Sequence, residues 1–331
     1  MNTILMPEFI TVAVAVFAAT VLIGHFLIPL LKSHKIGQTI YKLGPRWHSK
    51  KEGTPTMGGI CFIISILLVM AVVYIISAIR GDSRQLLPLA FTLSLAVANG
   101  MIGFFDDYTK LIKKQNEGFT PKQKLALQII VAVAYVAAMA FTGNLNTVLS
   151  LPYSSISIDL GWVYYVFAII LIVGMVNSTN LTDGIDGLAS SLALIVGAFF
   201  AIIAFKSVDR SLELVSAALI GATSGFLVYN FHPARVFMGD TGSLFIGGLI
   251  SGVAFMINKP IIVLIASSVF IFEMISSFLQ VLYFKLTHGK RLFKMAPVHH
   301  HFEKSGWSEK KIVIVFSLIT VVCCTAAWFA V

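Results

Sequence analysis

The chain contains ten long apolar runs, and a membrane-spanning helix needs about 20 such residues. Charged residues make up only 12% of its 331 residues, about half of the roughly 25% typical of a soluble domain. The pattern therefore predicts an all-α polytopic membrane protein, organised as a single transmembrane domain over residues 1–331. The expected spans are about 9–31, 58–79, 86–104, 125–142, 162–178, 187–205, 212–230, 242–258, 260–284 and 312–330.

Basic residues are distributed unevenly among the gaps between these runs. Of the 24 lysines and arginines, only Arg80, Arg84, Lys206, Arg210 and Lys259 lie in even-numbered gaps. Because basic loops stay in the cytoplasm, the odd gaps are expected to be cytoplasmic and both termini outside. The net charge of +9 thus belongs to loops between helices and does not indicate nucleic-acid binding. In the outer loop 145–160, alternating polar and apolar residues predict a small β-hairpin.

Acidic residues gather in the gaps assigned to the cytoplasm. Asp106 and Asp107 follow the third run, and Lys110 comes one helical turn later. Two adjacent carboxylates repel each other, so a bound cation or an incoming metal–phosphate group would relieve the cost of ionising both. The alternative is that the two aspartates are the solvated end of a helix.

Two further polar segments interrupt apolar sequence. Residues 177–187 include Asn180, Asp183 and Asp186, and polar groups at membrane depth usually mark a functional site. In residues 230–243, Gly239 and Gly242 flank Asp240 and Thr241. Glycine lets the backbone approach a ligand closely, and a helix that begins there presents free N–H groups to phosphate. The alternatives are a polar turn in the first segment and an ordinary helix cap in the second.

Three consecutive histidines, 299–301, lie in the long ninth gap. They cannot all bind one ion from a regular helix, and zinc usually takes ligands that are separated in the sequence. Hydrogen bonding to phosphate, or holding a loop, is therefore favoured over a zinc site. Glu273 lies inside the ninth run among apolar neighbours, where a packing or helix-interface role is expected.

Together these segments resemble the phospho-N-acetylmuramoyl-pentapeptide transferases, a branch of the polyprenyl-phosphate N-acetylhexosamine-1-phosphate transferases. The aspartate clusters are shared across the superfamily, whereas the histidine string is more typical of this branch. The stretches that carry the resemblance are 53–59, 104–108, 177–187, 230–243 and 297–303.

The resemblance implies transfer of phospho-MurNAc-pentapeptide from UDP-MurNAc-pentapeptide to undecaprenyl phosphate, giving lipid I and UMP, with Mg²⁺ as cofactor. It also implies a homodimer in the bacterial inner (plasma) membrane, with the catalytic loops in the cytoplasm. The alternatives are a sister transferase that uses UDP-GlcNAc and a membrane transporter. The histidine string argues against the first, and the position of most carboxylates at span ends argues against the second.

The resemblance also implies roles for individual residues. Asp240 is the expected magnesium ligand, Asp106 handles the phosphate of the lipid with Asp107 beside it, and Lys110 and Lys122 pair with phosphates. Eight further residues complete the expected site: Asn180 and Asp183 near the metal and diphosphate, His299 as a catalytic residue and His300 as a binding residue at the sugar-diphosphate end, and Asp186, Asn230, Phe237 and Gly239 around the uridine.

Overall fold

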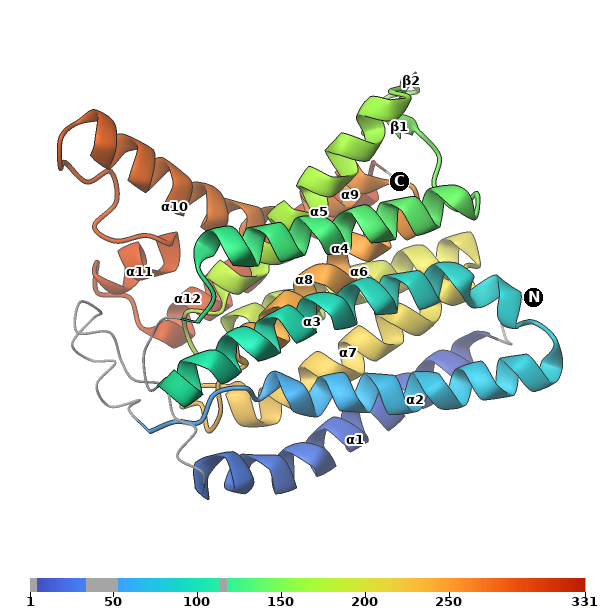
Figure 1. The fold of residues 1–331 in the computed structure, drawn as a ribbon, viewed down its shortest axis with the longest axis horizontal. Helices are drawn as coiled ribbons and strands as arrows, with labels where there is room; N and C mark the ends of the chain where they lie inside the picture. The colour runs from blue at the N-terminus through green and yellow to red at the C-terminus, as the bar shows by residue number, and fades with distance from the viewer. Residues whose placement is uncertain (1–4, 34–52, 114–117, 331) are drawn as a thin grey trace.

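The structure, a computed structural model, describes residues 5–33, 53–113 and 118–330 as an almost entirely helical bundle (Figure 1). Ten helices within this part of the chain are long and apolar enough to cross a membrane, which confirms the predicted fold class. Their bounds are Leu5–Ser33 (α1), Gly59–Arg80 (α2), Leu87–Lys113 (α3), Pro121–Phe141 (α4), Trp162–Thr182 (α5), Leu188–Ser207 (α6), Arg210–Asn230 (α7), Gly239–Met256 (α8), Ser268–Leu286 (α10) and Glu309–Trp328 (α12).

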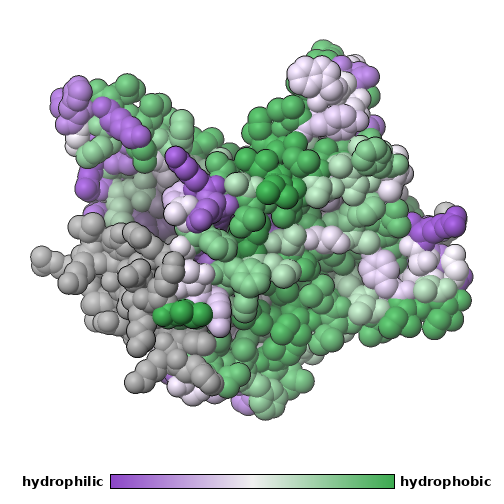
Figure 2. All heavy atoms as spheres, in the orientation of Figure 1, coloured by the Kyte–Doolittle hydropathy of each residue, from purple (hydrophilic) through white to green (hydrophobic). Residues whose placement is uncertain are grey.

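Helix α8 forms the centre of the bundle. It packs mainly against α3 and α5, and nearly all of its residues are buried. Helices α1 and α2 instead expose large apolar side chains, and so does α10 from Phe272 to Leu286. Figure 2 shows that such side chains cover much of the visible surface between the two ends of the bundle. This distribution fits a protein whose sides face lipid rather than water.

The ninth predicted span is the one that differs from expectation. Instead of one helix over 260–284, the structure has a short helix, Pro260–Ala266 (α9), and the separate helix α10, joined at Ser267. The Ser268 hydroxyl donates to the carbonyl oxygens of Leu264 and Ile265. Serine pairs and such bonds to the preceding turn bend helices, and hydropathy alone does not reveal the bend. Helix α10 consequently extends away from the bundle (Figure 1).

The two ends of the bundle differ in character. At one end, strands Val148–Ser150 (β1) and Ser157–Asp159 (β2) pair antiparallel, as predicted for the outer loop. The hairpin is anchored to the helices near it, because the Tyr153 hydroxyl donates to the carbonyl oxygen of Ala326 at 2.8 Å. The aspartate clusters lie at the other end. Residues 34–52, which carry most of the basic residues of the first expected cytoplasmic loop, are outside the described ranges.

An ion-pair cluster at the hairpin end joins three elements. Arg210, the first residue of α7, donates to both carboxylate oxygens of Glu8, at 3.0 and 2.8 Å. It also donates to Asp82 at 2.8 Å, in the connection after α2. The arginine side chain is 16% exposed, so solvent screens these contacts only in part.

Replacing this arginine should destabilise the protein. We expect Arg210→Ala to lower the free energy of unfolding by about 2 kcal/mol, because two half-buried carboxylates lose the charged donor that they share. Thermal unfolding in detergent measures the loss. Arg84→Ala is the matched control, since Arg84 is exposed at the same end of the bundle. Equal stability of the two variants would show that the cluster contributes nothing.

Candidate active site

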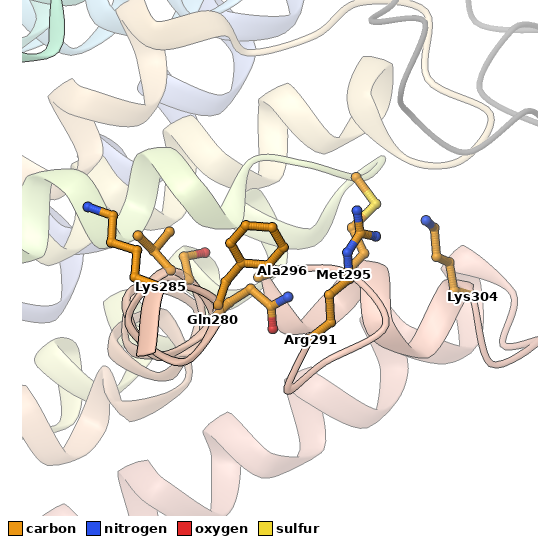
Figure 3. A pocket seen from close by; sticks show the side chains of 9 residues that line it. Gln280, Lys285, Arg291, Met295, Ala296 and Lys304 are labelled. Carbon is orange, nitrogen blue, oxygen red and sulfur yellow. The ribbon is translucent and has the colours of Figure 1, made fainter. Parts of the chain in front are cut away.

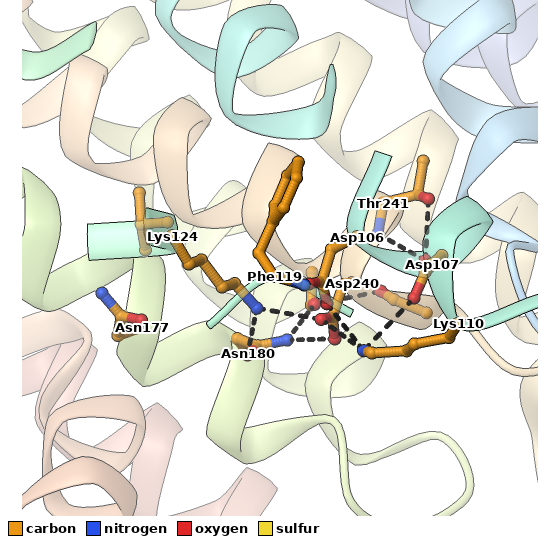
Figure 4. A network of polar contacts seen from close by, with 12 residues as sticks. Asp106, Asp107, Lys110, Phe119, Lys124, Asn177, Asn180, Asp240 and Thr241 are labelled. Carbon is orange, nitrogen blue, oxygen red and sulfur yellow. Dashed lines mark hydrogen bonds and ion pairs between the residues drawn. The ribbon is translucent and has the colours of Figure 1, made fainter. Parts of the chain in front are cut away.

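Three aspartates from two helices surround the ammonium group of Lys110 (Figure 4). Lys110 Nζ lies 2.7 Å from Asp106 Oδ2, 3.8 Å from Asp107 Oδ1 and 2.9 Å from Asp240 Oδ2. Lys110 follows Asp106 and Asp107 by four and three residues on α3, so these side chains share one face of that helix. Asp240 comes from the first turn of α8. The structure therefore brings together four of the five residues that the sequence analysis placed around the metal and phosphates.

Glycines allow α3 to lie directly against the start of α8. A Cβ atom on Gly103 would collide with the backbone of Asp240 and Thr241. Gly239 has φ of +74°, a conformation that favours glycine. In this close packing, Asp107 Oδ2 accepts hydrogen bonds from the backbone N–H of Thr241 at 3.0 Å and from its hydroxyl at 2.8 Å. Asp107 thus caps the first turn of α8 and fixes the direction of Asp240.

A second lysine reaches Asp240 from α4. Lys124 Nζ lies 2.9 Å from Asp240 Oδ2 and donates to Asn180 Oδ1 at 3.2 Å. Asn180 Nδ2 in turn donates to Asp240 Oδ1 at 2.8 Å. Lys122, the lysine expected from the sequence, is exposed and makes no contact with this cluster in the described part of the chain. Side chains two positions apart on a helix point in directions that differ by about 200°. Only one of the two lysines can therefore face the aspartates.

Asp183 directly follows α5 and lies beside the same cluster. Its burial, and then the carboxylates of Asp240, Asp107 and Asp186, raise the pKa of Asp183 well above its usual range, although a hydrogen bond from the Gly239 N–H opposes this. Four carboxylates and two ammonium groups therefore share a small volume, which leaves an excess of negative charge when all are ionised. A divalent cation would offset that excess.

The donor set fits magnesium. One oxygen from each of Asp106, Asp107 and Asp240 lies within 4.8 Å of the others. Carboxylate oxygens are the hard ligands that Mg²⁺ prefers, and its few protein ligands are usually one or two carboxylates. Lys110 and Lys124 contact the same Asp240 oxygen, so a metal ion bound there would compete with them.

Asp186 and Asn230, both expected at the uridine, are engaged in holding the loop between α7 and α8. Asp186 Oδ2 accepts from the backbone N–H of Ala234 at 3.0 Å and lies 3.0 Å from His232 Nδ1. Asn230 Oδ1 accepts from the backbone N–H of Gly187 at 3.1 Å, and its amide donates to the Val236 carbonyl oxygen. Both side chains are buried, so they position this loop.

The same loop is paired with the segment that precedes α2. The backbone N–H of Phe237 donates to the Pro55 carbonyl oxygen, and the Gly58 N–H donates to the Phe237 carbonyl oxygen, both at 2.8 Å. Phe237 is half-buried and adjoins Gly239. Residues 53–59 therefore support the loop that carries two of the residues expected around the uridine.

The three histidines point to three different partners. They lie on a short helix, Val298–Glu303 (α11). His299 Nδ1 lies 3.0 Å from Glu273 Oε2, His300 Nδ1 lies 2.6 Å from Glu303 Oε2, and His301 Nδ1 accepts from the Lys294 N–H. The three imidazoles therefore do not converge on one position.

Glu273 lies where α10 meets α11, in the helix-interface role that was one of the two expected for it. It is completely buried and holds His299, which is also completely buried. His299 Nε2 faces Gly184, where any Cβ atom would collide with it. This contact places the imidazole against the loop that carries Asp183. A charged group in an apolar run was visible in the sequence, but its partner lies 26 residues away.

Neutralising Glu273 should impair the histidine without unfolding the protein. We expect Glu273→Gln to lower kcat about tenfold, because a charge-assisted hydrogen bond that contributes roughly 1.5–3 kcal/mol becomes a neutral one. Steady-state kinetics should show the loss in kcat rather than in KM. Ile275→Val, on an exposed part of the same helix, is the control. A kcat equal to that of the control would leave Glu273 a packing residue.

Comparisons with known proteins identify the class to which this fold and site belong. The family model described as Glycosyl transferase family 4 matches residues 89–258, which contain all four clustered aspartates. A second match, described as Phospho-N-acetylmuramoyl-pentapeptide-transferase signature 1, covers residues 51–63.

Relatives named phospho-N-acetylmuramoyl-pentapeptide-transferase match over nearly the whole chain. The relative from Acetivibrio thermocellus is 42% identical over 95% of this chain and 92% of its own length. Those from Bacillus subtilis and Staphylococcus carnosus are each 44% identical, over 91% and 93% of this chain and 90% and 94% of their own lengths. The chain therefore belongs to the phospho-N-acetylmuramoyl-pentapeptide-transferase family, which confirms the resemblance found in the sequence.

Proposed function

We propose that the protein transfers phospho-MurNAc-pentapeptide from UDP-MurNAc-pentapeptide to undecaprenyl phosphate, producing lipid I and UMP. The observation that carries this proposal is the aspartate–lysine cluster at one end of a membrane-spanning bundle. A water-soluble nucleotide and a lipid-anchored phosphate can both reach such a position. Family membership supplies the identity of the two substrates.

Magnesium is the proposed cofactor, held by Asp240 together with Asp106 or Asp107. When bound, it would neutralise charge on the diphosphate and polarise the reacting phosphorus centre. Lys110 and Lys124 would pair with phosphate oxygens and screen the repulsion between the two anionic substrates. Asn180 orients Asp240 through the hydrogen bond between their side chains. Asp183, Phe237, Gly239 and His300 would bind the nucleotide and sugar, and His299 would act as a catalytic group at the sugar-diphosphate end. Asp186 and Asn230 would shape the uridine pocket by holding its loop.

The proposed chemistry is a single displacement. An oxygen of the lipid phosphate attacks the β-phosphorus of the UDP-sugar, the bond to the bridging oxygen breaks, and UMP leaves with that oxygen. Asp106 Oδ1 accepts a hydrogen bond from the Phe119 N–H at 2.6 Å, and its Oδ2 pairs with Lys110. Both oxygens of Asp240 are engaged as well. Such hydrogen-bonded carboxylates are poor nucleophiles, whereas the acceptor already carries a reactive oxygen.

Release of UMP tests this function directly. Purified protein with magnesium should release UMP only when UDP-MurNAc-pentapeptide and undecaprenyl phosphate are both present. UMP released from UDP-GlcNAc at a comparable rate would favour the sister transferase, and no UMP under any condition would favour a transporter. A stoichiometric burst of UMP without acceptor, with phospho-sugar retained on the protein, would overturn the single displacement.

The proposed location is the bacterial plasma membrane, with the aspartates facing the cytoplasm. We expect an impermeant thiol reagent applied to intact cells to label Ser155→Cys in the hairpin but not Lys310→Cys in the first turn of α12, since the basic gaps should stay inside. The three native cysteines are replaced first. The reverse labelling pattern would contradict this orientation. The single domain and the homodimer stay predictions.

A further inference from the structure

Three elements at the aspartate end of the bundle meet at the side chain of His232. His232 belongs to the loop between α7 and α8, Asp186 to the loop between α5 and α6, and Glu309 to the first turn of α12. One side-chain atom of each lies within 4.8 Å of the others. The sequence analysis gave a role to Asp186 alone, because its two partners lie 46 and 123 residues away in the sequence.

The imidazole of His232 serves as a hydrogen-bond donor in this network. His232 Nδ1 lies 3.0 Å from Asp186 Oδ2, which also accepts from the backbone N–H of Ala234 at 3.0 Å. Glu309 Oε2 lies 3.7 Å from the same nitrogen. Both neighbouring oxygens belong to carboxylates, so Nδ1 carries a hydrogen and donates it to Asp186. A hydrogen bond to a charged acceptor is roughly twice as strong as a neutral one.

Glu309 connects the two loops to a membrane-spanning helix. Its Oε2 accepts from the backbone N–H of Asp186 at 3.1 Å, and its side chain is only 9% exposed. Glu309 is the first residue of α12, where the helix dipole stabilises a negative charge. The loops before α6 and α8 are therefore attached to a rigid helix as well as to each other.

The hydrogen bonds account for this cluster without a metal ion. Asp186 Oδ2 has two donors and Glu309 Oε2 has one, so a cation would have to displace them. The network is also separate from the cavity of about 420 Å³ beside α10, whose lining contains none of the three residues (Figure 3). Its effect is therefore exerted on the two loops.

Both loops carry residues expected to bind the nucleotide and sugar. Phe237 follows His232 in one loop, and Asp183 precedes Asp186 in the other. A ligand bound between two loops loses affinity when the loops can move apart, because binding must then restore their relative placement. Hydrogen bonds between the loops should therefore act on nucleotide affinity and leave the reacting groups unchanged.

We propose that His232 and Glu309 are positioning residues that hold the two loops of the uridine pocket in one arrangement. The proposal rests on the proposed function. It adds two residues that act through Asp186 and the loop backbone rather than by contact with the nucleotide.

Equilibrium binding of UMP, which requires no turnover, tests the role of His232. We expect His232→Ala to raise the Kd for UMP about tenfold, the scale of one charge-assisted hydrogen bond. His232→Asn should recover most of the affinity, because its amide N–H can replace the Nδ1 donor. Initial rates should show the same loss in the KM for UDP-MurNAc-pentapeptide and not in kcat. His232 is 36% exposed, so neither substitution leaves a large buried void.

A double-mutant cycle tests whether the two residues act together. Glu309→Ala should also raise the Kd for UMP about tenfold. Because both residues hold the same loops, the double variant should stay close to the single variants instead of reaching the roughly 100-fold loss of independent effects. Lys310→Ala, at the next and exposed position of α12, is the matched control. Thermal melting of each sample verifies that the variants are folded.

Three outcomes would overturn the proposal. Unchanged Kd values in both single variants would show that the loops are held without these residues. Equal Kd values for His232→Asn and His232→Ala would mean that the imidazole only packs there. A multiplicative loss in the double variant would show that the two residues act separately. Failure of the wild type to bind UMP would instead count against the proposed function.

Discussion

Asp240→Asn is expected to lower kcat by about 10²–10³-fold, the largest effect of any single substitution proposed for this protein. Both oxygens of Asp240 are engaged, one by Asn180 and the other by Lys110 and Lys124. An amide nitrogen in place of one oxygen cannot accept these hydrogen bonds, and it binds Mg²⁺ poorly. We therefore expect the magnesium concentration for half-maximal activity to rise as turnover falls. Magnesium titration of the purified variant measures both quantities.

Unfolding is excluded by thermal melting of the same sample. Asp240 is only partly buried and lies in the first turn of α8, so its replacement should change stability little. Asp159→Asn in the exposed hairpin is the matched control and should retain full activity. Normal turnover of Asp240→Asn at the wild-type magnesium optimum would remove Asp240 from the metal site.

Much of the fold could be predicted because lipid imposes simple rules. A helix that crosses the hydrocarbon core must satisfy its backbone internally and must be about 20 residues long, so run length alone located the spans. The short hairpin was visible as a two-residue alternation. The break at Ser267 was not visible, because serine is tolerated within apolar helices. It depends on local hydrogen bonds of Ser268 and on packing against α12.

The aspartates of the site were visible for a related reason. Charge is costly beside lipid, so Asp106, Asp107 and Asp240 at span ends indicated function. The partners of buried groups were harder to predict, because they come from distant elements. The Glu273–His299 pair and the capping of Thr241 by Asp107 depend on how α10 meets α11 and how α3 meets α8. Sequence spacing contains no information on those contacts.

Lys124 was missed although the sequence contained a signal. A capping box between Thr120 and Gln123 marks the start of helix α4, so the residues after it are expected to follow helical spacing. Lys124 and Gln128 are then four residues apart on one face, and Gln128 is buried and accepts from Asn177 at 2.7 Å. Lys122 is followed at the same spacing by Ala126, an exposed apolar position. Helical periodicity would have favoured Lys124 over Lys122.

This difference gives a test in which the two lysines serve as a matched pair. We expect Lys124→Gln to lower kcat by about 10²-fold, because the cation that screens Asp240 and the substrate phosphates is lost. Lys122→Gln should stay close to the wild type, since that side chain is exposed and points away from the cluster. Initial rates of UMP release at saturating substrates measure both.

Magnesium dependence separates the role of Lys124 from that of Asp240. Lys124 contacts the Asp240 oxygen that would bind the metal ion, so its removal takes away a competitor. The magnesium concentration for half-maximal activity should therefore fall or stay unchanged in Lys124→Gln, whereas it should rise in Asp240→Asn. A rise in both variants would mean that Lys124 only holds Asp240 in place. Equal activities of the Lys122 and Lys124 variants would contradict a role for Lys124 in phosphate binding.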